Sequence, residues 1–141
     1  MRAKSTLFNQ RLAAVVTGLR FDELIVIADA GLPVPPGVET LDLALTHGKP
    51  SVADVLAVLV DELVIHEVIV AEETGRINPT VTAAVEQLTR PAGITVRAIP
   101  HDDIEVLIRR AKLVVQTGET TPYGNVVLAG GLDFFELGIA D

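Results

Sequence analysis

A run of five apolar residues that ends at an acidic residue constrains this chain more than any other stretch. Residues 24–28 read Leu-Ile-Val-Ile-Ala without polar alternation, and Asp29, Ala30 and Gly31 follow directly. Such a run, rich in β-branched residues, is typical of a strand that is covered on both faces, as in parallel sheets. Ligands of open α/β sheets bind just outside the carboxyl ends of these strands. Asp29 therefore stands where chemistry is common, although Asp before Gly is also a frequent turn former.

Helix and strand patterns alternate along the rest of the chain, with short connections. Asn9, Ser51 and Asn78 each precede a helical stripe of apolar residues and are of types that cap helix N-termini. A fourth helix is expected over 102–111. Besides 24–28, the expected strands are 38–45, 63–71, 94–99, 113–116 and 126–129. This alternation predicts one α/β domain over residues 1–141, a three-layer sandwich with a mostly parallel central sheet and helices on both faces.

Composition excludes several classes of partner. The formal net charge is −8, so the field around the protein repels phosphate backbones and no nucleic-acid partner is expected. The longest apolar tract, residues 52–71, is interrupted by charged residues and cannot span a bilayer. No cleavage site for a secretory signal is recognisable, so we expect a cytoplasmic protein without membrane contact. Hydrophobic residues make up 49% of so short a chain, which favours burial of surface in an oligomer.

The residue pattern does not support a metal or nucleotide site. His47, His66 and His101 fall on different predicted elements, and the chain has no cysteine. The glycines at 118 and 130–131 match neither a phosphate loop nor the dinucleotide fingerprint. No Gly-x-Ser-x-Gly elbow is present, so a hydrolytic serine has no support. We therefore expect neither a metal nor a cofactor.

Several polar residues instead follow predicted strands. These are Asp29, His101, Tyr123, Gly124 and Asn125. In a parallel sheet the turns that carry them can converge at one end, where acid, imidazole, phenol and amide groups form an inventory suited to a polyhydroxylated molecule. The alternative is that Asp29 only forms a turn, that His101 only enters a helix and that 123–125 is a simple turn.

Separated motifs in this chain resemble those of a known family. They are Asp-Ala-Gly-Leu-Pro-Val-Pro at 29–35, Asp-Leu-Ala-Leu-Thr-His-Gly-Lys-Pro-Ser at 42–51, Ala-Glu-Glu at 71–73, Pro-His at 100–101 and Thr-Gly-Glu-Thr-Thr-Pro-Tyr-Gly-Asn at 117–125. In this order, from about Asn9 to Phe134, they resemble the D-ribose pyranases, also called ribose mutarotases. The related L-fucose mutarotases share Tyr-Gly-Asn, but the Asp-Ala-Gly-Leu-Pro and Ala-Leu-Thr segments favour the ribose branch.

The resemblance implies a cytoplasmic, metal-free and cofactor-free isomerase that interconverts the pyranose and furanose forms of D-ribose. It also implies a ring-shaped homo-oligomer, a decamer of two pentameric rings, with sites at subunit boundaries. Carried over by motif, the sugar-binding positions are Asp29, His101, Tyr123, Gly124 and Asn125. We expect His101 to transfer a proton and Asp29 to orient or deprotonate a sugar hydroxyl, so both are candidate catalytic residues.

One departure from the family pattern stands just before the first strand. The family has Gly-His-Thr-Asp there, with the histidine as proton donor, whereas this chain has Arg20-Phe21-Asp22-Glu23. Phenylalanine cannot transfer a proton, so His101 would take over that role, or Asp22 or Glu23 would substitute for the histidine. The alternative functions are a catalytically impaired sugar-binding module and a mutarotase for another sugar, such as L-fucose.

Overall fold

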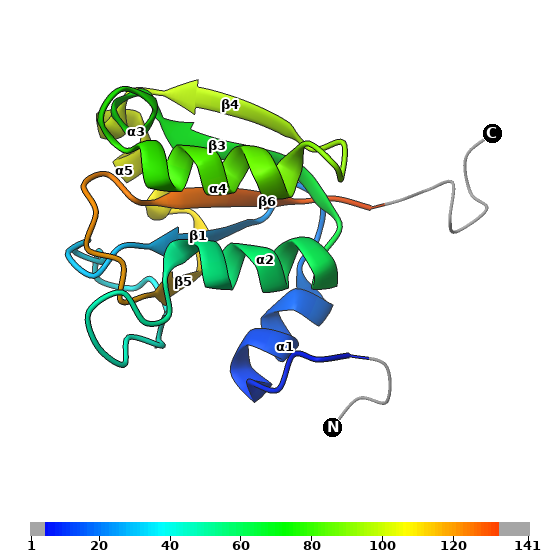
Figure 1. The fold of residues 1–141 in the computed structure, drawn as a ribbon. Helices are drawn as coiled ribbons and strands as arrows, with labels where there is room; N and C mark the ends of the chain where they lie inside the picture. Colours follow the sequence, from blue (N-terminus) through cyan, green and yellow to red (C-terminus); the bar gives the residue numbers. More distant parts are fainter. Residues whose placement is uncertain (1–4, 133–141) are drawn as a thin grey trace.

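Six strands pair in the order β2-β5-β1-β6-β3-β4 in the computed structural model of the protein, which describes residues 5–132 (Figure 1). Their bounds are Leu24–Ala28 (β1), Thr40–Asp42 (β2), Ile65–Ala71 (β3), Thr95–Ile99 (β4), Ala111–Gln116 (β5) and Val126–Gly130 (β6). β1, β5 and β2 pair in parallel, as do β3 and β4, and β6 is antiparallel to β1 and β3. The predicted mostly parallel sheet is confirmed.

The reversed strand β6 decides where the connection after β5 lies. Because β6 runs against its neighbours, its first residue lies at the carboxyl end of the parallel strands. Residues 117–125, which we call the site loop, therefore pass from the end of β5 to the start of β6 along this one end of the sheet. The segment after β1 and the start of α5 lie at the same end, on the left of Figure 1.

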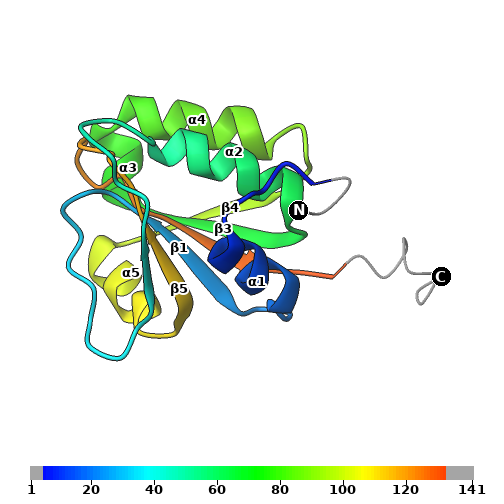
Figure 2. The ribbon, with the colours of Figure 1, turned by 90° about the horizontal axis from the view of Figure 1, so that it is seen from below.

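Helices cover both faces of the sheet, which confirms the three-layer prediction. The helices are α1 (Gln10–Gly18), α2 (Val52–Glu62), α3 (Glu72–Ile77), α4 (Pro79–Thr89) and α5 (His101–Ile108). Figure 2 shows α2 and α4 on one side of the sheet and α5 on the other. The side chains of Asn9, Ser51 and Asn78 each accept a hydrogen bond from the backbone N–H three residues later, so all three predicted caps are confirmed.

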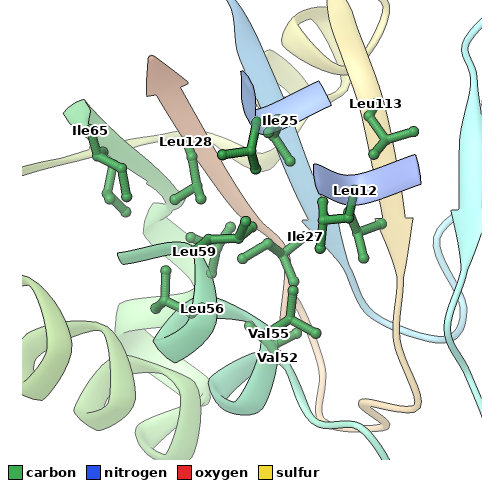
Figure 3. Packing of buried hydrophobic residues seen from close by; sticks show 14 of the residues in the cluster. Leu12, Ile25, Ile27, Val52, Val55, Leu56, Leu59, Ile65, Leu113 and Leu128 are labelled. Carbon is green, nitrogen blue, oxygen red and sulfur yellow. The ribbon is translucent and has the colours of Figure 1, made fainter. Parts of the chain in front are cut away.

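β1 is buried on both faces, as its apolar run predicts, with every residue at most 4% exposed. Ile25 and Ile27 belong to a cluster that includes residues of α1, α2 and α4, and Figure 3 shows them beside α2. Val26 and Ala28 belong to a second cluster, which contains residues of α5. Burial of a large aliphatic side chain contributes roughly 1.5–3 kcal/mol, so alternate residues of β1 tie both helical layers to the sheet.

Some boundaries differ from the predictions. The extended segment expected over 38–45 is a strand only at Thr40–Asp42, and the helix expected over 102–111 ends at Ile108, so that β5 begins at Ala111. Glu72 and Glu73 begin α3, a short helix that the sequence pattern does not predict, and their carboxylates suit the positive end of the helix dipole. Phe134, where the family resemblance ends, lies outside the described residues. Among residues 5–132 no helix is long and apolar enough to cross a membrane.

Candidate functional site

The site loop is anchored at its start by a close backbone approach. A Cβ placed on Gly118 would lie 2.2 Å from the carbonyl oxygen of Thr46 and 2.7 Å from the amide nitrogen of Lys49. The Gly118 N–H donates to Pro50 O (2.8 Å), and Gly118 O accepts from the Gly48 N–H (2.6 Å). Only glycine fits this contact without movement of the backbone, so the turn 46–49 fixes where the loop leaves β5.

A buried carboxylate holds the middle of the loop. Glu119 is only 7% exposed, and its carboxylate accepts hydrogen bonds from the backbone N–H of Val52 (3.0 Å) and the hydroxyl of Thr121 (2.8 Å). The Val52 N–H is one of the unpaired amides at the start of α2, so the loop also caps that helix. Glu119 was not among the predicted site residues, although a charged residue inside an otherwise small and polar motif was an available signal.

Asp29 bonds both to its own turn and to the end of the site loop. Its Oδ1 accepts from the Gly31 N–H (3.0 Å), which is the turn-forming bond expected of Asp before Gly. Its backbone N–H donates to Asn125 Oδ1 (2.8 Å), and its Oδ2 lies 3.4 Å from the donating N–H of Gly124. The turn-forming and site-forming interpretations of Asp29 are therefore compatible, because different atoms serve each.

His101 is held by contacts from three other residues. Its backbone N–H donates to the carboxylate of Glu73 on α3 (3.2 Å), and its ring meets Tyr123 edge-on with 5.0 Å between ring centroids. Its Nε2 lies 3.3 Å from Glu105 Oε1 on the next turn of α5. Its Nδ1 is buried and has no hydrogen-bond partner among the described residues. His101 is thus more than a locally bonded helix-entry residue, since a buried nitrogen without a partner calls for one.

The predicted site residues are brought to one place. Gly124 and Asn125 contact Asp29, and Tyr123 of the same segment contacts His101. Asn125 is buried, whereas the Tyr123 side chain is exposed. Together they gather hydrogen-bond donors, acceptors and an imidazole at the carboxyl end of the parallel strands, an arrangement suited to binding hydroxyl groups and moving protons between them. In the described part of the chain no three His, Asp or Glu side chains group as metal ligands.

Phe21, Asp22 and Glu23 lie at the other end of β1. The five residues of β1 separate them from Asp29 by more than about 13 Å, at roughly 3.3 Å per residue. Phe21 is 57% exposed and packs its ring against His66, with 4.9 Å between ring centroids. Within one chain, Asp22 and Glu23 therefore lie too far from Asp29 to act on the same sugar, and their substitution for the missing histidine stays a prediction about neighbouring copies.

Comparison with known proteins agrees with this architecture. The model of the RbsD / FucU transport protein family matches residues 2–133. A D-ribose pyranase of Pseudomonas putida is 42% identical over 131 residues, covering 93% of this chain and 98% of the relative, and one of Symbiobacterium thermophilum is 41% identical with the same coverage.

Solved structures share the fold. RbsD of Bacillus subtilis, complexed with D-ribose, superposes with a TM-score of 0.89 at 37% identity and covers 95% of this chain and 100% of that chain. A fucose mutarotase of Streptococcus pneumoniae, in complex with L-fucose, has a TM-score of 0.79 at 17% identity over 94% of this chain and 99% of that one, a likeness of fold alone. By its family match and its identity to these relatives, the chain belongs to the RbsD / FucU transport protein family.

Proposed function

We propose that this protein is a mutarotase that interconverts the pyranose and furanose forms of D-ribose without a cofactor. The observation that carries the proposal is the meeting of Asp29, His101 and residues 123–125 at one end of the sheet. Identity of 42% to a D-ribose pyranase supports the same substrate. The L-fucose alternative has less support, because the fucose mutarotase is only 17% identical.

The chemistry asks for one proton acceptor and one proton donor. Opening a hemiacetal ring needs a base at the anomeric hydroxyl and an acid at the ring oxygen, and reclosure through another hydroxyl changes the ring size. We assign proton transfer to His101, whose buried Nδ1 lacks a partner among the described residues: it accepts the anomeric hydroxyl proton and returns that proton to the ring oxygen. Asp29 orients or deprotonates a sugar hydroxyl, and Tyr123, Gly124 and Asn125 fix the ring through their phenol, amide N–H and carboxamide groups.

Exchange NMR on D-ribose tests this proposal. The wild-type protein is expected to speed pyranose–furanose exchange, and His101→Ala to slow the catalysed rate by about 10²- to 10⁴-fold, the contribution of a positioned acid or base. Arg90→Ala is the control, since Arg90 is exposed at the C-terminal end of α4, the end opposite Asn78. Unchanged exchange in a folded His101→Ala protein would contradict the assignment.

The same experiment separates the alternatives. Line broadening of ribose signals without faster exchange identifies a sugar-binding module that lacks catalysis. Faster exchange of L-fucose than of D-ribose identifies the fucose branch. Either result would overturn ribose mutarotation as the function.

The oligomer and the cellular location belong to this proposal as well. We propose a decamer of two pentameric rings in the cytoplasm. The described chain supports burial between copies, because Phe8, Phe21 and Leu45 are 70%, 57% and 82% exposed. The absence of cysteine is compatible with a reducing compartment. Sedimentation velocity distinguishes a decamer from a pentamer or a monomer of 15.0 kDa.

A further inference from the structure

Asn78 connects the start of α4 to the site loop. Its side chain is 2% exposed, and its Oδ1 accepts from the Val81 N–H (3.0 Å), the capping bond of α4. Its Nδ2 donates in the other direction, to Thr121 Oγ1 (2.8 Å) and to Pro122 O (2.8 Å). The sequence pattern predicts only the cap for Asn78, yet both amide hydrogens serve the loop that carries Tyr123.

Thr74 on α3 holds the next residue of the site loop, Tyr123, through a hydrogen bond. It is 1% exposed, and its hydroxyl donates to the carbonyl oxygen of Tyr123 at 2.6 Å. Its own carbonyl accepts from the Asn78 N–H (2.9 Å) and from the Thr82 hydroxyl (3.1 Å). Two consecutive carbonyls of the site loop are therefore held by buried side chains, that of Pro122 by Asn78 and that of Tyr123 by Thr74. A backbone hydrogen bond joins these two supporting residues to each other.

The residue held in this way has an uncommon backbone conformation. Tyr123 has φ of 52°, in the left-handed region that side chains rarely adopt. This conformation sets the direction of its ring, which meets His101 edge-on, and of the following Gly124 N–H, which points to Asp29. If the two carbonyls were released, the segment would relax toward ordinary φ values and both contacts would change.

We propose that Asn78 is a positioning residue of the sugar site, which acts through the site loop by holding Tyr123 in its left-handed conformation, with Thr74 as its partner. This inference rests on the proposed function, since the loop is taken to bind the sugar. Asn78 touches neither Asp29 nor His101 by any hydrogen bond found in residues 5–132, so its effect is indirect.

The substitution Asn78→Asp tests the proposal with little change of shape. Aspartate keeps the oxygen that caps α4, but it replaces the two N–H donors with lone pairs that face Pro122 O and Thr121 Oγ1. Asn9→Asp is the matched control, because Asn9 caps α1 through the Leu12 N–H and bonds to no residue of the site loop in the described structure. We expect kcat/KM for ribose exchange to fall about 10- to 100-fold in Asn78→Asp and less than about twofold in Asn9→Asp, since small misplacement of binding groups has effects of this size.

A second readout does not depend on activity. Tyr123 is the only tyrosine and the chain has no tryptophan, so tyrosine emission reports this loop alone. Asn78→Asp and Thr74→Val are expected to change the tyrosine emission. They are also expected to weaken the nuclear Overhauser cross-peak between the ring protons of Tyr123 and His101, whereas Asn9→Asp leaves both signals as in the wild type. If Asn78→Asp does not fold, Asn78→Ser keeps a capping oxygen and removes the amide without adding charge.

Two results would overturn the inference. One is a folded Asn78 variant with wild-type emission and wild-type ring contact. The other is a loss of kcat/KM no larger than that of Asn9→Asp. If the wild-type protein does not speed ribose exchange, the proposed function fails by itself, and the emission and ring contact of the variants still decide whether Asn78 positions Tyr123.

Discussion

The two ring nitrogens of His101 are in different surroundings. Nε2 faces the carboxylate of Glu105 at 3.3 Å, while Nδ1 is buried and unpartnered among the described residues. A neutral imidazole whose Nε2–H donates to Glu105 carries its lone pair on Nδ1. If Nε2 carries the proton toward Glu105, Nδ1 is the nitrogen that we propose accepts a sugar hydroxyl proton, and Glu105 is the group placed to fix that tautomer.

Glu23 lies before β1, at the end of the strand opposite Asp29, and its ionisation is expected to make stability depend on pH. The pKa of Glu23 is lowered from its ordinary value of 4.5, first by the hydrogen bond from the Arg20 backbone N–H and then by the ammonium of Lys112 at 3.1 Å. A lowered folded-state pKa means that the ionised Glu23 stabilises the fold above the unfolded value of 4.5, and that this contribution is lost as pH falls through the folded value.

Urea denaturation of Glu23→Gln at neutral and acid pH tests this linkage. We expect Glu23→Gln to lower the unfolding midpoint at pH 7 and to approach the wild-type midpoint as pH falls through the lowered pKa of Glu23, because the wild-type carboxylate then becomes protonated. Glu86→Gln is the control, since Glu86 is exposed and its ion-pair partner, Arg90, is 4.0 Å away. An equal difference between wild type and Glu23→Gln at both pH values would contradict the linkage.

At the scale of elements, the site depends on a contact between two loops. The turn 46–49 and the first residues of the site loop touch through backbone atoms, and Gly118 is the point of closest approach. Side-chain rotation cannot relieve a clash with backbone, so a larger residue at 118 must displace one of the two loops. The position of the site loop is thus tied to the segment between β2 and α2.

Gly118→Ala is expected to lower the free energy of unfolding by about 1–3 kcal/mol, the usual cost of overpacking a close contact. Ribose exchange should slow in the same variant, because the loop that carries Tyr123 and Asn125 would shift. Gly75→Ala is the control, since a Cβ at that position of α3 meets nothing within 4 Å. Chemical denaturation measures the first effect and exchange NMR the second, and equal stability of the two variants would refute the argument.

At the scale of the whole molecule, the two ends of β1 face away from each other. Asp29 lies at one end of β1 and Phe21 at the other. Phe21 can therefore approach an Asp29 side chain only if that side chain belongs to another copy of the protein. The family resemblance implies sites at subunit boundaries and a histidine at the position of Phe21. In a ring-shaped oligomer, position 21 of one subunit would then serve the site of its neighbour.

Phe21→His tests this arrangement. If the introduced histidine of one copy reaches the site of the next, ribose exchange should accelerate, on the order of tenfold or more within the range that a positioned acid supplies. Phe8→His is the matched control, because Phe8 is an exposed phenylalanine before α1. Co-assembly of the double variant Phe21→His/Asp29→Asn with wild-type subunits should yield sites that combine the introduced histidine of one copy with the intact Asp29 of another. An unchanged rate in Phe21→His and in the mixed assembly would count against a shared site.

The elements of this fold could be predicted because their signals are local. The apolar run at 24–28 predicted a strand buried on both faces, and Asn9, Ser51 and Asn78 predicted three helix starts, since capping depends on atoms three residues apart. The short helix at Glu72–Ile77 was missed, because two glutamates after a strand carry no apolar stripe. The polar residues after the strands predicted which side chains would meet, given a parallel sheet.

The sequence by itself determined the layers of the fold and the choice of Asp29, His101 and residues 123–125 as candidates. The tertiary structure decided how these residues are held. The roles of Glu119, Thr74 and the amide of Asn78 arise from hydrogen bonds between residues 43 to 67 positions apart, which no local pattern encodes. It also decided where the site loop starts, because the backbone of the turn 46–49, far away in the sequence, lies against Gly118.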